Sequence, residues 1–235
     1  MTEQMDATQD RLAQRDDPTR DKIKAAAQRL FSTHGLDGVS VRDIVKAAGA
    51  KNGASLHYYF GSKEGLITEL VLDGARRSEE GRRRALDLLE GAGGPRRVAD
   101  IVRLLVEVET GKHSEPKAGV PTAAQGSAPA GLGHMRFIVA LQISHRQLMR
   151  TVLDGQQNTA YLKCLAYLRR LMPDLPPDVV NQRLIFMYII LTTSLAAREA
   201  AFENDPTGGK LWSSPHALEN LIASITGALE GPFPA

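Results

Sequence analysis

The sequence has one cysteine and few aromatic residues. Cys164 is the single cysteine in 235 residues, so no disulfide can form within the chain, and its apolar neighbours favour a buried thiol over a redox sensor. Aromatic residues make up 5% of the chain and apolar residues 43%. This composition favours helix-on-helix packing over a sheet, and we expect an all-α fold.

Long apolar runs and catalytic motifs are also absent. The chain has no stretch of 18 or more apolar residues and no signal-peptide pattern, which predicts a cytoplasmic protein without a membrane span. No Gly-rich phosphate loop follows a strand pattern, and no His-Glu-x-x-His, Gly-x-Ser-x-Gly or paired-cysteine spacing occurs. We therefore expect no enzyme activity and no bound cofactor or metal.

The stretch from residue 39 to residue 60, in contrast, has the pattern of two short helices around a tight turn. Ser40 fits the N-cap of the first helix, and Asp43, three residues later, fits the acidic partner of a capping box. Gly49 can adopt the left-handed conformation that ends this helix. A helix, a Gly-containing turn and a second helix are the components of a helix-turn-helix.

The second of these helices is dense in polar and aromatic side chains. A hydroxyl, an imidazole and two phenols lie within five residues, and such groups suit a groove lined by phosphate oxygens and base edges. Taken singly, Tyr58 or Tyr59 could equally pack on the domain core. We predict a DNA-reading surface on this helix and the preceding turn, formed by Lys51, Asn52, Ser55, His57, Tyr58 and Tyr59.

The net charge of +2 is distributed unevenly along the chain. Residues 1–17 have a net charge of −3, whereas residues 18–63 hold eight Lys or Arg against three acidic residues. Clustered charge on helices is usually a solvated face, and we interpret the arginine run at residues 76–84 in this way. The basic excess at the helix-turn-helix instead favours contact with the phosphates of double-stranded DNA.

Two blocks of this region resemble the DNA-binding domain of the tetracycline-repressor (TetR) family. They are residues 26–41 and residues 56–67, the latter reading Leu-His-Tyr-Tyr-Phe-Gly-Ser-Lys-Glu-Gly-Leu-Ile, with Ala-Gly at 48–49 between them. The resemblance implies that Arg42 reaches base edges and that Lys63 holds the DNA backbone. Between positions 49 and 60 the chain is one residue longer than the commonest family pattern, which leaves the start of the recognition helix open.

Composition and periodicity divide the chain into three parts. Residues 1–17 are a polar arm that we expect to be flexible, residues 18–63 form the helix-turn-helix DNA-binding domain, and residues 64–235 form a larger helical domain for ligand binding and dimerisation. Gly, Pro, Ala and Ser dominate residues 111–133, which predicts a mobile loop. Apolar periodicity predicts the further helices, over residues 18–33, 62–90, 96–110, 134–154, 159–172, 176–204 and 214–230.

An apolar stripe in the larger domain is the candidate ligand site. His145 on this stripe is either a satisfied core histidine, which we favour, or a polar anchor in an apolar pocket. The same stripe is equally consistent with plain core. The candidate lining residues are Met135, Leu141, His145, Met149, Tyr161, Met187, Tyr188 and Leu191.

The last two long helices carry more apolar and small surface than one buried face requires. This surplus, which includes Ile185 and Ile189, favours a two-fold homodimer, and the family resemblance implies a four-helix interface. The predicted interface residues are Thr192, Thr193, Ala196, Ala197, Leu221, Ser224, Ile225 and Ala228.

Together these features predict a dimeric DNA-binding transcription regulator with a palindromic operator. The resemblance implies a repressor that a small apolar or aromatic effector releases from the operator. One competing class is a helical ligand-binding or adaptor protein in which the helix-turn-helix is only structural. A helical enzyme is a third class, for which the sequence offers no catalytic residues.

Overall fold

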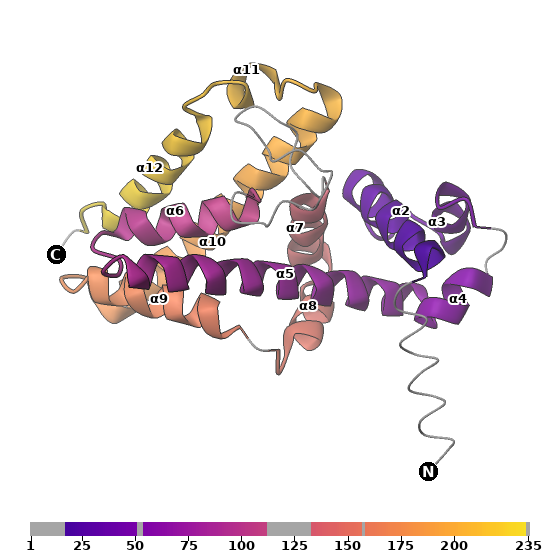
Figure 1. The fold of residues 1–235 in the computed structure, drawn as a ribbon, viewed down its shortest axis with the longest axis horizontal. Helices are drawn as coiled ribbons and strands as arrows, with labels where there is room; N and C mark the ends of the chain where they lie inside the picture. The colour runs from indigo at the N-terminus through magenta and orange to yellow at the C-terminus, as the bar shows by residue number, and fades with distance from the viewer. Residues whose placement is uncertain (1–16, 51–53, 112–132, 157, 234–235) are drawn as a thin grey trace, which may run out of the picture. The chain divides into compact units, whose positions relative to one another are not determined.

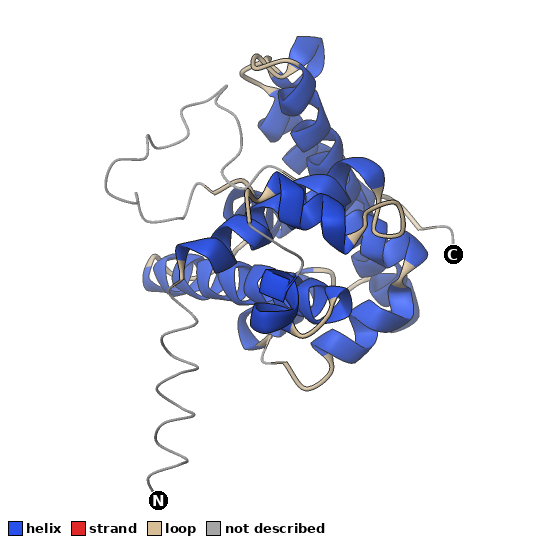
Figure 2. Ribbon diagram, turned by 90° about the vertical axis from the view of Figure 1, so that its right-hand side faces the viewer, coloured by secondary structure: helices blue, strands red, loops and turns tan. Residues whose placement is uncertain are grey.

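The computed structural model describes residues 17–50, 54–111, 133–156 and 158–233. Every regular element within these ranges is a helix and none is a strand, which confirms the expected all-α class (Figures 1 and 2). The chain forms two compact units. The first unit contains the chain up to Asp73 together with Ala140–Asp154, and the second contains Gly74–Val139 and Gly155–Ala235.

In the first unit, α2 packs on two short helices. These elements are α2 (Pro18–His34), α3 (Val41–Ala47) and α4 (Ala54–Phe60). Asp17 caps α2 by accepting a hydrogen bond from the Thr19 N–H (2.7 Å), and the left-handed Gly35 (φ 72°) ends it. The core of this unit consists of fully buried apolar side chains, among them Ile23, Phe31, Ile44, Leu56 and Leu66.

The first unit extends beyond residue 63, where the sequence suggested a boundary. Helix α5 (Lys63–Gly91) is continuous, and the unit follows it to Asp73. Ion pairs of 2.5 Å join Lys24 of α2 to Glu69 and Asp73 of α5, and Arg20 to Glu69. Residues 17–73 hold eight basic and seven acidic residues, so acids on α5 offset much of the local basic excess.

The single helix predicted over residues 134–154 is wrong. The chain forms α7 (His134–Ser144) and α8 (Arg146–Leu153), separated by His145, whose backbone is not helical (φ −132°, ψ 38°). The His145 Nε2 atom lies 3.2 Å from a carboxylate oxygen of Asp37, in the turn before α3. His145 is therefore a half-buried residue of the first unit that faces the helix-turn-helix entry, and it is not a core histidine.

The second unit is built on α10 (Pro177–Asn204). Its other helices are α6 (Val98–Glu109), α9 (Thr159–Leu171), the short α11 (Gly209–Trp212) and α12 (Ala217–Glu230). Helix α10 packs on α9, α11 and α12, and α6 packs on α9 and α12. The length and composition of α10 would suit a membrane span, but this packing makes it the core helix of the unit.

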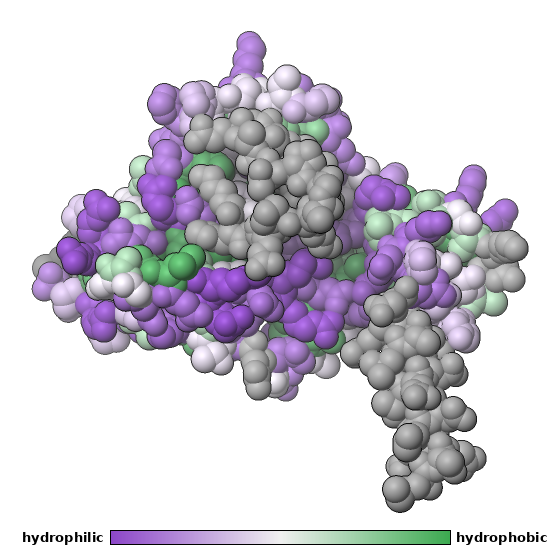
Figure 3. Space-filling view, in the orientation of Figure 1, coloured by the Kyte–Doolittle hydropathy of each residue, from purple (hydrophilic) through white to green (hydrophobic). Residues whose placement is uncertain are grey.

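The arginine run on α5 divides into a solvated part and a packed part. Arg83 pairs with Glu80 (3.2 Å) and Asp87 (3.6 Å) on its own helix, as expected, and hydrophilic side chains cover α5 in the view of Figure 3. Arg82 differs, because its guanidinium pairs with Glu109 of α6 (2.7 Å) and lies over the Tyr161 ring of α9. The interpretation as a solvated face is therefore wrong for Arg82.

Candidate DNA interface

The first helix of the motif begins at the predicted capping box. The Ser40 N–H donates to the Asp43 carboxylate (3.0 Å), and the Asp43 N–H donates to the Ser40 hydroxyl (3.2 Å). The hydrogen bonds from Ser40 lower the pKa of the Asp43 carboxyl. Gly49 follows α3 with φ 67° and makes the predicted left-handed turn.

Helix α4 has one buried side and one exposed side. Leu56 and Phe60 are buried in the core of the first unit, whereas Tyr58 is 62% exposed and His57 is exposed. The His57 Nδ1 atom lies 2.9 Å from the Gly61 carbonyl oxygen. Because a carbonyl can only accept, Nδ1 donates, and Nε2 of the neutral ring is left as an acceptor.

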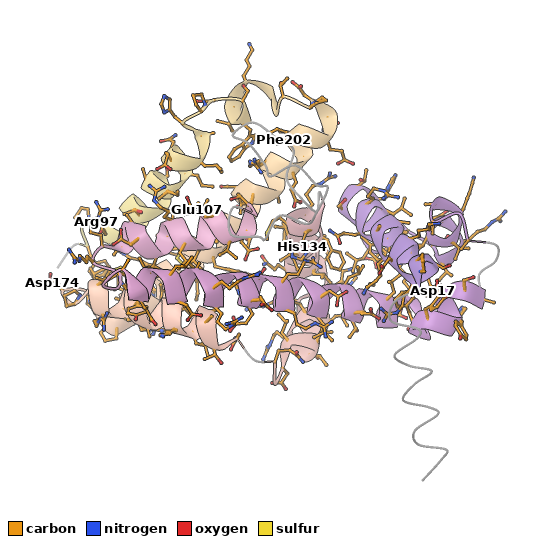
Figure 4. The ribbon with its side chains drawn as sticks, in the orientation of Figure 1. Asp17, Arg97, Glu107, His134, Asp174 and Phe202 are labelled. Carbon is orange, nitrogen blue, oxygen red and sulfur yellow. The ribbon has the colours of Figure 1, made fainter. Side chains whose placement is uncertain are left out.

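Tyr59 has a structural bond that the sequence did not reveal. Its ring is half-buried and its hydroxyl donates a short hydrogen bond to the Asp17 carboxylate, 42 positions away at the start of α2, where Asp17 is labelled in Figure 4. This bond lowers the pKa of Asp17 and raises the pKa of Tyr59. The link is thus intact between these two values, across the neutral range, and fails as pH falls through the lowered pKa or rises through the raised one.

Lys63 also makes an internal contact. Its ammonium donates to the Leu36 carbonyl oxygen (2.6 Å) and lies over the Phe31 ring, with the nitrogen 5.7 Å from the ring centre. This contact fixes the turn between α2 and α3 to the start of α5. An ammonium has three protons, so the predicted phosphate contact stays compatible with this position.

The remaining predicted DNA residues are placed as follows. Arg42 is exposed on α3 and Ser55 is half-buried on α4. Lys51 and Asn52 lie outside the described residues. Lys22, Arg29 and Lys46 are further exposed cations of this unit.

The candidate ligand residues are divided between the two units. Leu141, His145 and Met149 belong to the first unit. The other five belong to the second unit, where Met135, Met187 and Leu191 are buried in its core and Tyr161 and Tyr188 are half-buried.

A polar residue, His134, lies within the second unit. The His134 imidazole packs against Gly74 of α5, where an added Cβ would come within 2.2 Å of the ring, and His134 is labelled in Figure 4. Burial lowers the pKa of His134 to about 4, so the ring is neutral at pH 7.

The predicted interface residues fall into two groups. Thr192, Ala196, Leu221 and Ile225 are buried within the chain's own second unit. Thr193, Ala197, Ser224 and Ala228 are exposed. Three large apolar side chains of α10 are also exposed, Ile185 (59%), Phe186 (56%) and Ile189 (47%).

Comparison with known proteins decides the family. The model of the bacterial regulatory proteins of the tetR family matches residues 23–70, and the model of the tetracyclin repressor-like C-terminal domain matches residues 121–228. The chain belongs to the TetR family. The two models together cover the helix-turn-helix and most of the second unit, and residues 71–120 lie between the two matches.

Curated relatives of this TetR-family chain are regulators. The repressor AcnR of Corynebacterium efficiens is 28% identical over 153 residues, which cover 58% of this chain and 79% of AcnR. The probable regulator YttP of Bacillus subtilis is 47% identical over 53 residues, 23% of this chain and 25% of YttP. Among solved structures, the TetR-family regulator PfmR of Thermus thermophilus has 16% identity and a TM-score of 0.49, covering 90% of this chain and 99% of PfmR.

This TetR-family protein is therefore a transcription regulator and not an enzyme. The helix-turn-helix is the family's DNA-binding element and not merely a structural one, which removes the adaptor alternative.

Proposed function

We propose that this regulator is a homodimeric, cytoplasmic repressor that binds a palindromic operator and leaves it when a small effector with an apolar or aromatic body binds the second unit. The observation that carries the DNA part is the exposed side of α4. Leu56 and Phe60 fix the helix in the core, while Tyr58 and His57 face solvent. Their hydroxyl and imidazole groups suit base edges and phosphates.

Operator binding can be tested by fluorescence anisotropy with the DNA upstream of the protein's own gene and a scrambled duplex, at two salt concentrations. We expect sequence-selective binding that weakens with salt. Tyr58→Ala should lower operator affinity about tenfold, the equivalent of roughly 1–2 kcal/mol. Because this side chain is 62% exposed, the thermal stability should stay within about 1 °C of the parent protein.

Tyr59→Phe is the matched control for Tyr58→Ala. It removes only the hydroxyl that donates to Asp17, so we expect a small loss of stability and an operator affinity close to that of the parent protein. If Tyr59→Phe instead lowers operator affinity and Tyr58→Ala lowers only stability, Tyr59 contacts the DNA and our assignment of the α4 face is wrong.

The homodimer is supported by the exposed apolar side of α10. Ile185, Phe186 and Ile189 project from the helix that forms the core of the second unit, and the exposed small residues Ser224 and Ala228 lie on α12, which packs beside it. Small side chains allow helices of two chains to approach closely. A two-fold dimer would present two copies of α4 to successive major grooves, about 34–36 Å apart.

The double variant Ile185→Glu with Ile189→Glu tests this surface. We expect loss of about 3 kcal/mol of association energy, which raises the dimer dissociation constant about a hundredfold, measured by analytical ultracentrifugation. Leu88→Glu is the control, because Leu88 is 70% exposed on α5, and this variant should remain dimeric. Equal sedimentation of the double variant and the parent protein would place the interface elsewhere.

Helix α7 offers a route from effector to DNA. Its N-terminal residues belong to the second unit and its last turn to the first, and the following His145 lies beside Asp37 at the entry to the helix-turn-helix. An effector that binds better to one position of α7 would shift the population of recognition-helix positions. If a bound effector at saturation leaves operator affinity unchanged, this part of the proposal fails.

A further inference from the structure

One ring nitrogen of His57, on the exposed side of α4, is already engaged by the backbone that ends this helix. Its Nδ1 atom lies 2.9 Å from the Gly61 carbonyl oxygen, and the Gly61 N–H in turn donates to the His57 carbonyl oxygen (3.0 Å). Gly61 has φ 72°, the left-handed conformation common just after a helix. The end of α4 therefore fixes both the orientation of the imidazole and the position of its proton.

The second ring nitrogen of His57, Nε2, is left as an acceptor. A carbonyl oxygen can only accept, so the neutral ring carries its proton on Nδ1 and presents a lone pair at Nε2. The side chain is exposed, and within the described part of the chain it makes no other hydrogen bond and no ion pair. This acceptor is available to a partner outside the chain.

The groups that DNA offers limit what this acceptor can bind. Phosphate oxygens only accept, and so do guanine N7 and O6, adenine N7 and thymine O4 in the major groove. The donors in that groove are the exocyclic amines, adenine N6 and cytosine N4. A neutral His57 with its proton on Nδ1 can form a hydrogen bond with these amines and with none of the other groups.

We propose that His57 recognises the exocyclic amine of one base in each half-site of the operator, so that adenine or cytosine is required there. Guanine or thymine at the same place presents an acceptor to Nε2, which removes the hydrogen bond and sets two lone pairs against each other. This inference rests on the operator binding proposed above and narrows it, because it assigns His57 to base recognition and not to the phosphates.

Base analogues test this contact directly. Duplexes are first selected from a random library with the full-length parent protein, at about pH 8, where imidazole side chains are neutral. In the selected duplex each adenine is then replaced in turn by purine and each cytosine by pyrimidin-2-one, which removes only the amine. At one position per half-site we expect the affinity of the parent protein to fall about five- to tenfold.

His57→Phe should bind the duplexes with and without that amine equally well, because it keeps a ring and lacks the acceptor. The same duplexes serve both proteins, so any weakening of the base pair cancels in the comparison. The slope of log affinity against log salt should be the same in His57→Phe and in the parent protein, because no phosphate contact is lost. A shallower slope by about 0.9 would assign His57 to a phosphate and overturn the proposal.

Two further variants separate recognition from a structural effect on α4. Tyr59→Phe removes a different hydrogen bond of this helix, the one to Asp17, and should keep the dependence on the amine. His57→Arg presents only donors and should select guanine in place of adenine or cytosine. The proposal is wrong if His57→Arg selects the same base as the parent protein, or if Tyr59→Phe loses the amine dependence together with His57→Phe.

The outcomes distinguish this proposal from the proposed function. If the library yields an enriched operator but no amine replacement weakens the parent protein, or each weakens His57→Phe equally, operator binding stands and the role of His57 is refuted. If the library yields no enriched sequence, sequence-selective operator binding itself fails, and base recognition by His57 fails with it.

Discussion

Gly65→Ala should lower the free energy of unfolding by about 1–3 kcal/mol and the operator affinity by about ten- to a hundredfold. A Cβ at position 65 would lie 2.1 Å from the Phe60 carbonyl oxygen, which is backbone at the end of α4. The Gly65 N–H also donates to the Ser62 hydroxyl (3.0 Å) and so fixes the start of α5. A methyl group can be accommodated only if the junction opens, which tilts α4 away from its position.

The control for this variant is Gly91→Ala on the same helix, where an added Cβ meets nothing within 4 Å. Alanine has the higher helix propensity, so Gly91→Ala should leave stability unchanged or slightly raised. Urea unfolding and operator anisotropy measure both variants. If Gly65→Ala unfolds at the same urea concentration as the parent protein and binds the operator equally well, the α4–α5 junction is not the constraint described here.

Glu199→Ala should destabilise the protein by about 2–4 kcal/mol. Glu199 is 5% exposed, and its two carboxylate oxygens accept from the first N–H groups of α7, 63 and 64 positions earlier in the chain. These N–H groups have no partner within their own helix, and each buried donor left without an acceptor costs about 1–3 kcal/mol. The change should also weaken any effect of an effector on operator affinity, because it releases the α7 N-terminus.

Glu203→Ala, one turn further along α10, is the matched comparison. Glu203 pairs with the Arg136 side chain at the surface, with a side chain that is 43% exposed, so its removal should cost less than about 1 kcal/mol. Urea unfolding distinguishes the two variants. Equal losses in both would mean that Glu199 contributes through surface charge and not as a helix cap.

Sequence reasoning succeeded where the interacting groups are neighbours in the chain. The Ser40–Asp43 capping box and the Gly49 turn each lie within a few residues. Their geometry follows from local backbone preferences. The family motif added the order of the helices around them.

Contacts between residues far apart in the sequence could not be predicted in this way. The Tyr59 hydroxyl donates to Asp17, 42 positions away, and the Lys63 ammonium donates to the Leu36 carbonyl oxygen, 27 positions away. No local sequence pattern predicts either partner. Periodicity also could not detect the break at His145, because the apolar spacing continues through it.

The predicted interface shows the same limit in another form. Thr192 is buried and Thr193 is exposed although both are small neighbours. When a helix has two apolar sides, its sequence pattern does not indicate which side packs within its own chain and which side is exposed.

The continuity of α5 constrains how this regulator can exchange parts with its relatives. Lys63–Gly91 is one helix that begins in the first unit and ends in the second. A hybrid that takes its first unit from one family member and its second unit from another must therefore join two halves of α5 without changing the helical rotation between them. One residue gained or lost in α5 turns everything after it by about 100° and moves it about 1.5 Å along the axis. Seven residues make nearly two whole turns and restore the phase to within about 20°. Viable hybrids should therefore preserve the length of α5 or change it by whole heptads.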